Sequence, residues 1–137
     1  MIVLYYNVSS KTSRQAISWF DDYKIEVTQK RVEKLVRNDL IFILSLTENG
    51  FSDILKKSTG PETRIHKMRQ SLKQVNFNEA VEILLENTDI VKVPIIFDDK
   101  KLVIGYNSES IRVFIEKEYR RRYMHENTTE KESLLRC

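Results

Sequence analysis

The sequence is poor in the residues from which disulfide frameworks and metal sites are built. Its 137 residues include one cysteine, Cys137, and two histidines, His66 and His125. A single cysteine excludes an internal disulfide framework, and two separated histidines do not form a cluster of metal ligands. Apolar runs are also short, since none approaches the roughly 18 residues that a membrane span needs. We therefore expect a cytoplasmic protein with no membrane contact, no metal and no cofactor.

Apolar residues are nevertheless numerous enough for one core. Hydrophobic side chains make up 41% of the 137 residues. A chain of this size buries about two-thirds of its extended surface when it folds as one unit. We therefore expect a single domain.

Basic residues gather in two places, although the net charge is only +3. Between residues 56 and 73 the only acid is Glu62, and the phrase "YRRRYMH" at residues 119–125 holds three consecutive arginines. Such residues either solvate a surface and favour a helix C-terminus, or contact DNA phosphates in a salt-sensitive way. Both explanations remain open for Lys56, Lys57, Arg64, Lys67, Arg69, Lys73, Arg120, Arg121 and Arg122.

The first elements that the sequence predicts are a strand, a helix and a second strand. Residues 2–6 form an apolar run, and residues 12–22 carry apolar side chains at helical spacing. The phrase "KIEVTQKRV" at residues 24–32 alternates Ile25 and Val27 with polar neighbours, which is typical of a strand. This order predicts a parallel pair of strands joined by a right-handed crossover.

The middle of the chain is predicted to be mainly helical. Two short helices meet at Gly50, which we expect to stop the first of them in a left-handed conformation. Helical spacing continues over residues 64–72 and again over residues 77–84. Asn78 is the expected cap of the last of these helices, and Phe77 lies on its apolar stripe.

The phrase "VKVPIIFDDKKLVIGY" predicts a hairpin. Two apolar runs, residues 95–97 and 102–104, flank the polar "DDKK". Pro94 precedes the first run, a place where proline is tolerated and where a cis peptide bond is accessible. Asn107 or Ser108 can then cap a last helix.

The loop between the first strand and the first helix is dense in hydroxyl groups. It reads "YYNVSSKTSRQA", and it holds Ser9, Ser10, Thr12 and Ser13. Serine and threonine are ordinary helix caps, because their oxygens accept hydrogen bonds from the free N–H groups of the first turn. A hydrolytic serine would need a neighbouring base, and no histidine lies in or near this loop. The residues therefore favour capping over catalysis.

The whole order of elements is that of an α/β protein with a thioredoxin-like layout and a helical insertion. With this order of elements, the chain resembles the arsenate reductase and Spx family. Within that family it is similar to the Spx branch of bacterial transcription regulators that bind RNA polymerase. The resemblance runs from residue 1 to about residue 122. It rests on four phrases, "LYYNVSSKTSRQA", "LTENGFSDIL", "VPIIFDDKKLVIGYN" and "SESIRVFI".

The layout divides the single domain into three parts. Residues 1–37 and 88–122 are the expected thioredoxin-like core, and residues 38–87 are the expected helical insertion. Residues 123–137 have no apolar periodicity and are expected to form a tail. The resemblance also implies turnover by Clp protease through the C-terminus, although the ending "ESLLRC" departs from the small residues expected there.

The resemblance implies that the first loop has lost its chemistry. In redox-sensing relatives this loop carries Cys-x-x-Cys, and those positions fall on Ser10 and Ser13. Disulfide exchange needs a thiolate, which serine cannot supply. Arsenate reductases also hold the oxyanion with arginines, but Val93 stands at one of these positions and Ser58 at a second, where Arg64 could substitute. A redox switch and an oxyanion reductase are therefore both disfavoured.

A protein partner is implied at the glycine of the inserted helices. In Spx relatives the C-terminal domain of the RNA polymerase α subunit docks beside this glycine, which corresponds to Gly50. Gly50 could instead serve only as a helix cap, and Phe51 could be either an interface anchor or a core residue. The expected binding residues are Thr47, Glu48, Asn49, Gly50, Phe51, Ser52 and Asp53.

Two functions of different classes therefore remain. The favoured one is a non-enzymatic transcription regulator that reaches promoter DNA only through the polymerase and takes no small-molecule substrate. The alternative is a thioredoxin-fold oxidoreductase of the arsenate reductase type, for which Cys137 is the only cysteine.

Overall fold

The fold is an α/β arrangement around a four-stranded sheet. The computed structural model describes residues 1–115. The predictions for Arg120, Arg121 and Arg122 and for the tail at residues 123–137 lie outside the described residues. Within residues 1–115, no helix is both long enough and apolar enough to span a membrane.

The sheet has the strand order β2-β1-β3-β4. β1 (Val3–Tyr6) pairs in parallel with β2 (Thr28–Arg31) and antiparallel with β3 (Ile95–Phe97), which forms a hairpin with β4 (Leu102–Ile104). The parallel pair and the hairpin were both predicted and are confirmed. The predicted extent of the second strand is wrong, because only the polar second half of its phrase pairs with β1.

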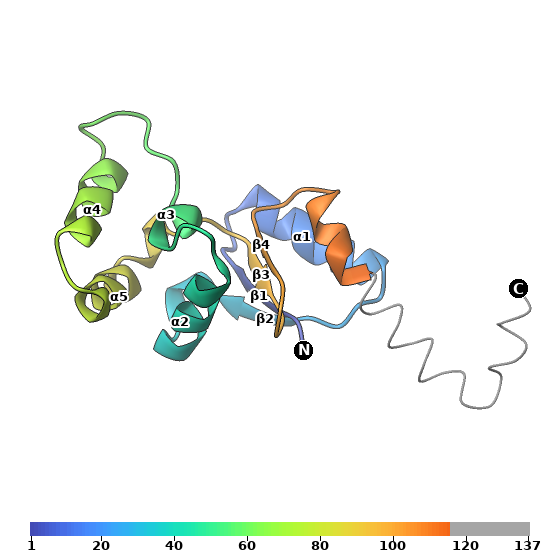
Figure 1. Cartoon of the computed structure of the whole chain (residues 1–137). Coiled ribbons are helices and arrows are strands. Elements are labelled where there is room, and N and C mark those ends of the chain that lie inside the picture. Colours follow the sequence, from blue (N-terminus) through green and yellow to red (C-terminus); the bar gives the residue numbers. More distant parts are fainter. Residues whose placement is uncertain (116–137) are drawn as a thin grey trace, which may run out of the picture.

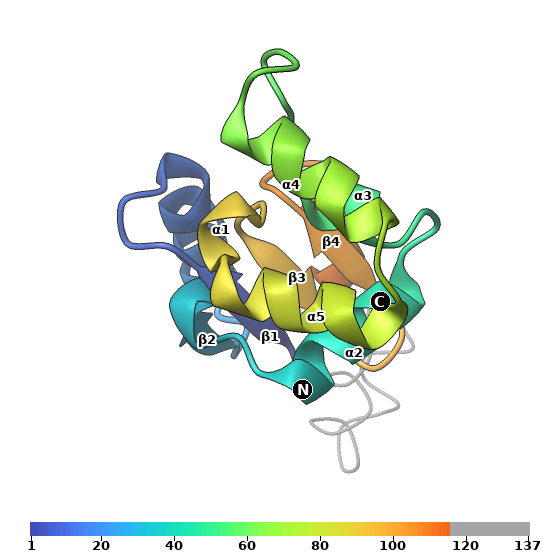
Figure 2. The same ribbon diagram turned by 90° about the vertical axis from the view of Figure 1, so that its left-hand side faces the viewer.

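Helices cover both faces of the sheet. α1 lies on one face, and α2, α3, α4 and α5 lie on the other, between β2 and β3 in the sequence (Figures 1 and 2). The α-helices are α1 (Lys11–Asp22), α2 (Arg37–Leu46), α3 (Phe51–Ile54), α4 (Arg64–Lys73) and α5 (Phe77–Glu86). Short 3-10 helices span Val32–Lys34, Thr88–Ile90 and Ser110–Arg112.

The pleat of the sheet separates the core into two clusters. Leu4 and Ile96 are buried on the face that α1 covers, together with Phe20. Tyr5 and Ile95 are their neighbours along the strands, and they point to the other face. Successive side chains of a strand alternate between faces, so each short strand supplies both clusters.

Two details of α5 differ from the sequence prediction. The cap is Asn76 and not Asn78, since the Asn76 side chain accepts a hydrogen bond from the N–H of Glu79 at 2.9 Å. Phe77 is therefore the first residue of the helix, and it is 50% exposed instead of lying on the buried stripe. Phe77 contacts the ring of Phe51, but the core does not cover the rest of its side chain.

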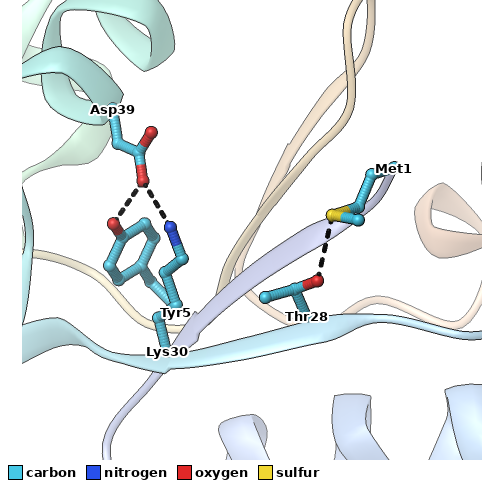
Figure 3. A network of polar contacts seen from close by, with 5 residues as sticks. All are labelled: Met1, Tyr5, Thr28, Lys30 and Asp39. Carbon is cyan, nitrogen blue, oxygen red and sulfur yellow. Dashed lines mark hydrogen bonds and ion pairs between the residues drawn. The ribbon is translucent and has the colours of Figure 1, made fainter.

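A polar cluster ties the inserted helices to the sheet (Figure 3). The hydroxyl of Tyr5 on β1 donates a hydrogen bond to Oδ2 of Asp39 on α2, and Nζ of Lys30 on β2 lies 3.2 Å from the same oxygen. Tyr5 is fully buried, and this burial, followed by the bond to Asp39, raises the pKa of its hydroxyl well above the ordinary value. Tyr5 is therefore neutral and acts as a donor over the physiological range.

Replacing Tyr5 with phenylalanine should lower the free energy of unfolding by about 1–2 kcal/mol, because a bond to a charged acceptor is lost while the ring stays packed. Lys30→Met should change it by less than ~1 kcal/mol, since that ion pair is solvent-exposed. Urea titrations of Tyr5→Phe and Lys30→Met at neutral pH measure both changes, and equal losses of unfolding free energy in the two variants would contradict the expectation.

The raised pKa of Tyr5 in the folded chain also means that stability is lost as the pH rises above the ordinary tyrosine pKa.

Candidate functional site

The serines of the first loop hold the backbone in place. Ser10 caps α1, because its Oγ accepts a hydrogen bond from the N–H of Ser13 at 3.1 Å. Ser13 is fully buried, and its Oγ accepts from the N–H of Asn7 at 3.3 Å. Ser10 and Ser13 stand at the positions that carry the switch cysteines in redox-sensing relatives. Their hydroxyl oxygens accept hydrogen bonds from the backbone of the loop and of the first turn of α1.

The hydroxyls of Ser10, Thr12 and Ser13 bond to one another and to backbone atoms in the described part of the chain. Oγ1 of Thr12 lies 3.0 Å from Oγ of Ser10 and donates to the carbonyl oxygen of Val93 at 3.1 Å, just before the cis peptide bond to Pro94. Within residues 1–115, neither Ser10 nor Ser13 is hydrogen-bonded to a histidine, a carboxylate or a cationic side chain. Hydroxyl nucleophiles need such a base, so this loop lacks the means to activate one.

Arg64, the expected substitute for an anion-binding arginine, is engaged elsewhere. Its guanidinium forms an ion pair with Asp89 and donates a hydrogen bond to Oδ1 of Asn87 at 2.7 Å. These partners lie at the end of α5 and in the 3-10 helix that follows it. The arginine therefore connects α4 to the segment that follows α5.

The loop between α2 and α3 contains Gly50, and its conformation corrects one prediction. α2 already ends at Leu46 with Thr47 as its C-cap, so Gly50 does not stop that helix. Gly50 instead precedes the first residue of α3, with φ 68° and ψ −135°. The positive φ was expected and is confirmed, and this combination of angles is close to a region that only glycine occupies readily. The sequence predicted the need for glycine but assigned it to the wrong helix.

Asp53 lies in α3, and its side chain is hydrogen-bonded to the preceding part of this loop. Its carboxylate accepts hydrogen bonds from the backbone N–H groups of Glu48 at 3.1 Å and Asn49 at 3.0 Å, and from Nδ2 of Asn49 at 3.2 Å. The backbone N–H of Asn49 is the main reason that the pKa of Asp53 lies below its ordinary value. Thr47 closes the other side, since its Oγ1 accepts from the N–H of Gly50 at 3.0 Å.

The loop is therefore rigidly bonded and open to solvent. The side chains of Glu48, Asn49 and Ser52 are exposed. A Cβ added at Gly50 would meet no atom within 4 Å, so the space beside this glycine is free. The seven predicted binding residues are thus the connection at residues 47–50 and the first three residues of α3, and several of their side chains are exposed.

Phe51 packs against the core, and its role as an interface anchor stays a prediction. Its ring is partly buried and packs against the core cluster on the insertion side. It also contacts the exposed ring of Phe77 on α5, with ring centroids 5.9 Å apart. The aromatic pair forms an apolar patch next to the Gly50 loop.

A cleft between α3 and α4 was not predicted from the sequence. We call it the α3–α4 cleft; its volume is about 250 Å³, and its apolar wall consists of Phe51, Leu55 and Leu72. Arg69 and Lys73 line it as well, one helical turn apart on α4. The spacing of these cations was readable, but the pairing of α3 with α4 depends on tertiary packing.

The basic residues expected near DNA do not form one uniform surface. Nη2 of Arg69 donates to the carbonyl oxygens of Leu55 and Lys56, both at 3.0 Å, so this arginine, like Arg64, is partly engaged within the insertion. Lys57 and Lys67 are exposed and form no ion pair with any residue among 1–115. The side chain of Lys56 is exposed in the same way.

The matching family covers most of the chain. Residues 5–114 match the ArsC family, a span that contains the first loop, the inserted helices and the hairpin. The chain belongs to the ArsC family. The predicted family placement is thereby confirmed.

Curated relatives specify the branch of the family. The chain is 34% identical over 126 residues to the global transcriptional regulator Spx 1 of Lactococcus lactis, covering 90% of this chain and 96% of that protein. It is 30% identical over 128 residues to the global transcriptional regulator Spx of Streptococcus pneumoniae, covering 92% and 94%. These relatives support placement in the Spx branch.

Solved structures support the predicted fold. A Staphylococcus aureus protein determined by NMR in solution superposes with a TM-score of 0.67 at 17% identity, over 82% of this chain and 97% of that chain. The arsenate reductase from Vibrio cholerae superposes with a TM-score of 0.55 at 15% identity, over 84% and 95%. At such identities the likeness shows the fold alone, and the thioredoxin-like architecture with a helical insertion is confirmed.

Proposed function

We propose that this chain is a cytoplasmic, non-enzymatic transcription regulator of the Spx type that binds the C-terminal domain of the RNA polymerase α subunit, here called the α domain. The observation that carries the proposal is the loop at residues 47–53, which is fixed by Asp53 and open at Gly50. A binding loop that is ordered before association loses little conformational entropy when the partner arrives. The names of the Lactococcus lactis and Streptococcus pneumoniae relatives support the regulatory role.

The proposed activity does not depend on thiol chemistry. Ser10 and Ser13 occupy the places of the switch cysteines, and their oxygens accept hydrogen bonds within the loop. Neither serine can form a disulfide, and neither is hydrogen-bonded to an activating base among residues 1–115. The geometry favours a regulator over an oxidoreductase for this reason.

Promoter DNA enters the proposal through the polymerase. Lys56, Lys57 and Lys67 are exposed on the insertion and would contribute to a favourable potential near DNA phosphates. Such contacts position a protein on the duplex without reading its sequence. We propose that promoter choice is supplied by the polymerase and not by this chain.

Binding of the isolated α domain should be equal with and without dithiothreitol. We expect affinities within about twofold, since no residue of the first loop can be oxidised to a disulfide. Titration calorimetry under both conditions measures this, with Cys137→Ser as the control for intermolecular disulfides. A reversible change of about tenfold or more that persists in Cys137→Ser would contradict redox insensitivity.

A further inference from the structure

We propose that the α3–α4 cleft is a second contact for the same α domain and that it receives an apolar side chain of the partner with a neighbouring carboxylate. This inference rests on the proposed function. It adds the chemistry of the partner surface, which the Gly50 loop alone does not specify. Three features of the cleft support it, namely its apolar wall, its cations and its position.

The apolar wall is suited to a partner side chain. Phe51 is only partly buried in the free chain, whereas Leu55 and Leu72 behind it belong to the core. Covering the remaining apolar surface of Phe51 would remove it from water, which is favourable in proportion to the area. Partly exposed aromatic residues beside a pocket are typical anchors of protein interfaces.

Arg69 and Lys73 give the cleft a positive charge. The guanidinium of Arg69 is held by the carbonyl oxygens of Leu55 and Lys56 and so has a fixed position at the rim. The ammonium group of Lys73 forms no ion pair with any residue among 1–115. No carboxylate lines the described cleft, so its charge is uncompensated. Opposite charge on the occupant is therefore expected.

The position of the cleft makes it continuous with the Gly50 loop. Asn49 and Ser52 belong to the loop and also line the cleft. The carboxylate of Asp53 in this loop has both oxygens bonded to loop donors. A domain that approaches Gly50 closely would lie over the cleft as well. The proposed occupant is consequently an acidic patch of the α domain with an apolar residue at its centre.

Reversing the charge of Lys73 tests this inference. Lys73→Glu should weaken binding of the isolated α domain by about tenfold or more at low salt, because an acidic partner group would face a carboxylate. Lys67→Glu is the matched control, since it makes the same change on the same helix outside the cleft, and it should weaken binding by no more than about twofold. Thermal melts of both variants separate folding from binding.

The partner side completes the test. Variants of the α domain with single carboxylates changed to lysine should include one that strengthens binding to Lys73→Glu by about tenfold and does not strengthen binding to Lys67→Glu. Equal effects of Lys73→Glu and Lys67→Glu, or no rescue by any variant, would overturn the cleft assignment while leaving binding at Gly50 intact. Absence of binding by the unaltered chain would overturn both the proposed function and this inference.

Discussion

Replacing Gly50 with arginine is expected to weaken binding of the α domain by at least about thirtyfold, which corresponds to roughly 2 kcal/mol. A Cβ added at Gly50 meets no atom within 4 Å, so the first atom of a new side chain has room there. The same space is where the partner surface would lie. The arginine would therefore obstruct the partner and bring a desolvated charge into the interface.

The matched control is Gly50→Ala. Any side chain at φ 68° and ψ −135° is strained, and we expect both variants to lose about 1–3 kcal/mol of folding stability. Alanine adds only one methyl group to an open space, so it should retain most of the binding. Calorimetry with the α domain, beside thermal melts of both variants, gives the comparison. Tight binding by a folded Gly50→Arg variant would remove Gly50 from the interface.

Replacing Asp53 with alanine should weaken binding by about five- to tenfold without unfolding the chain. The change removes the acceptor for the N–H groups of Glu48 and Asn49, so the loop at residues 47–53 would sample other conformations. Apparent affinity falls in proportion to the fraction of molecules in the competent conformation. Glu86→Ala is a suitable control, because the Glu86 carboxylate is exposed and forms no ion pair among residues 1–115.

The pH dependence of the loop follows from the same carboxylate. The pKa of Asp53 is lowered from its ordinary value of 3.8, mainly by the N–H of Asn49. Because the pKa of Asp53 is lower in the folded chain, the stabilisation that its carboxylate provides is complete above pH 3.8. This stabilisation is lost as the pH falls through the lowered pKa. The effect of Asp53→Ala on binding should therefore be constant between about pH 8 and about pH 5. If the unaltered chain and Asp53→Ala came to bind the α domain equally well within this pH range, the proposed role of Asp53 in ordering the loop would be contradicted.

Local patterns in the sequence predicted the elements that local interactions determine. The hairpin at residues 95–97 and 102–104 has the predicted bounds, because two short apolar runs flank a polar connection. Ser10 caps α1 as expected, since capping depends only on the first turn of the helix. The first loop could thus be assigned from the sequence almost completely.

Features that depend on tertiary contacts were missed or misplaced. β2 forms where a polar segment runs beside β1, and alternation of Ile25 and Val27 pointed to the wrong half of the phrase. Gly50 was predicted to need a positive φ, but the bonds from Asp53 that shape its loop could not be inferred from spacing. The α3–α4 cleft likewise requires the contact between Arg69 and the end of α3.

The fold separates the first loop from the proposed binding loop. The first loop lies at the N-terminus of α1 and is internally bonded, whereas the Gly50 loop belongs to the insertion on the other face of the sheet (Figure 1). The network of Tyr5, Lys30 and Asp39 fixes that insertion to the strands. The hydrogen bonds that hold the two loops are therefore separate within the described residues.

The most direct test of the account maps the interface in solution. Amide NMR spectra of the nitrogen-15-labelled chain would be recorded during titration with the unlabelled α domain, with and without dithiothreitol. We expect the largest shift changes at residues 47–53 and along the α3–α4 cleft, with the same pattern under both conditions. Changes centred on the first loop at residues 7–13, or the absence of any change at saturating partner, would contradict the account.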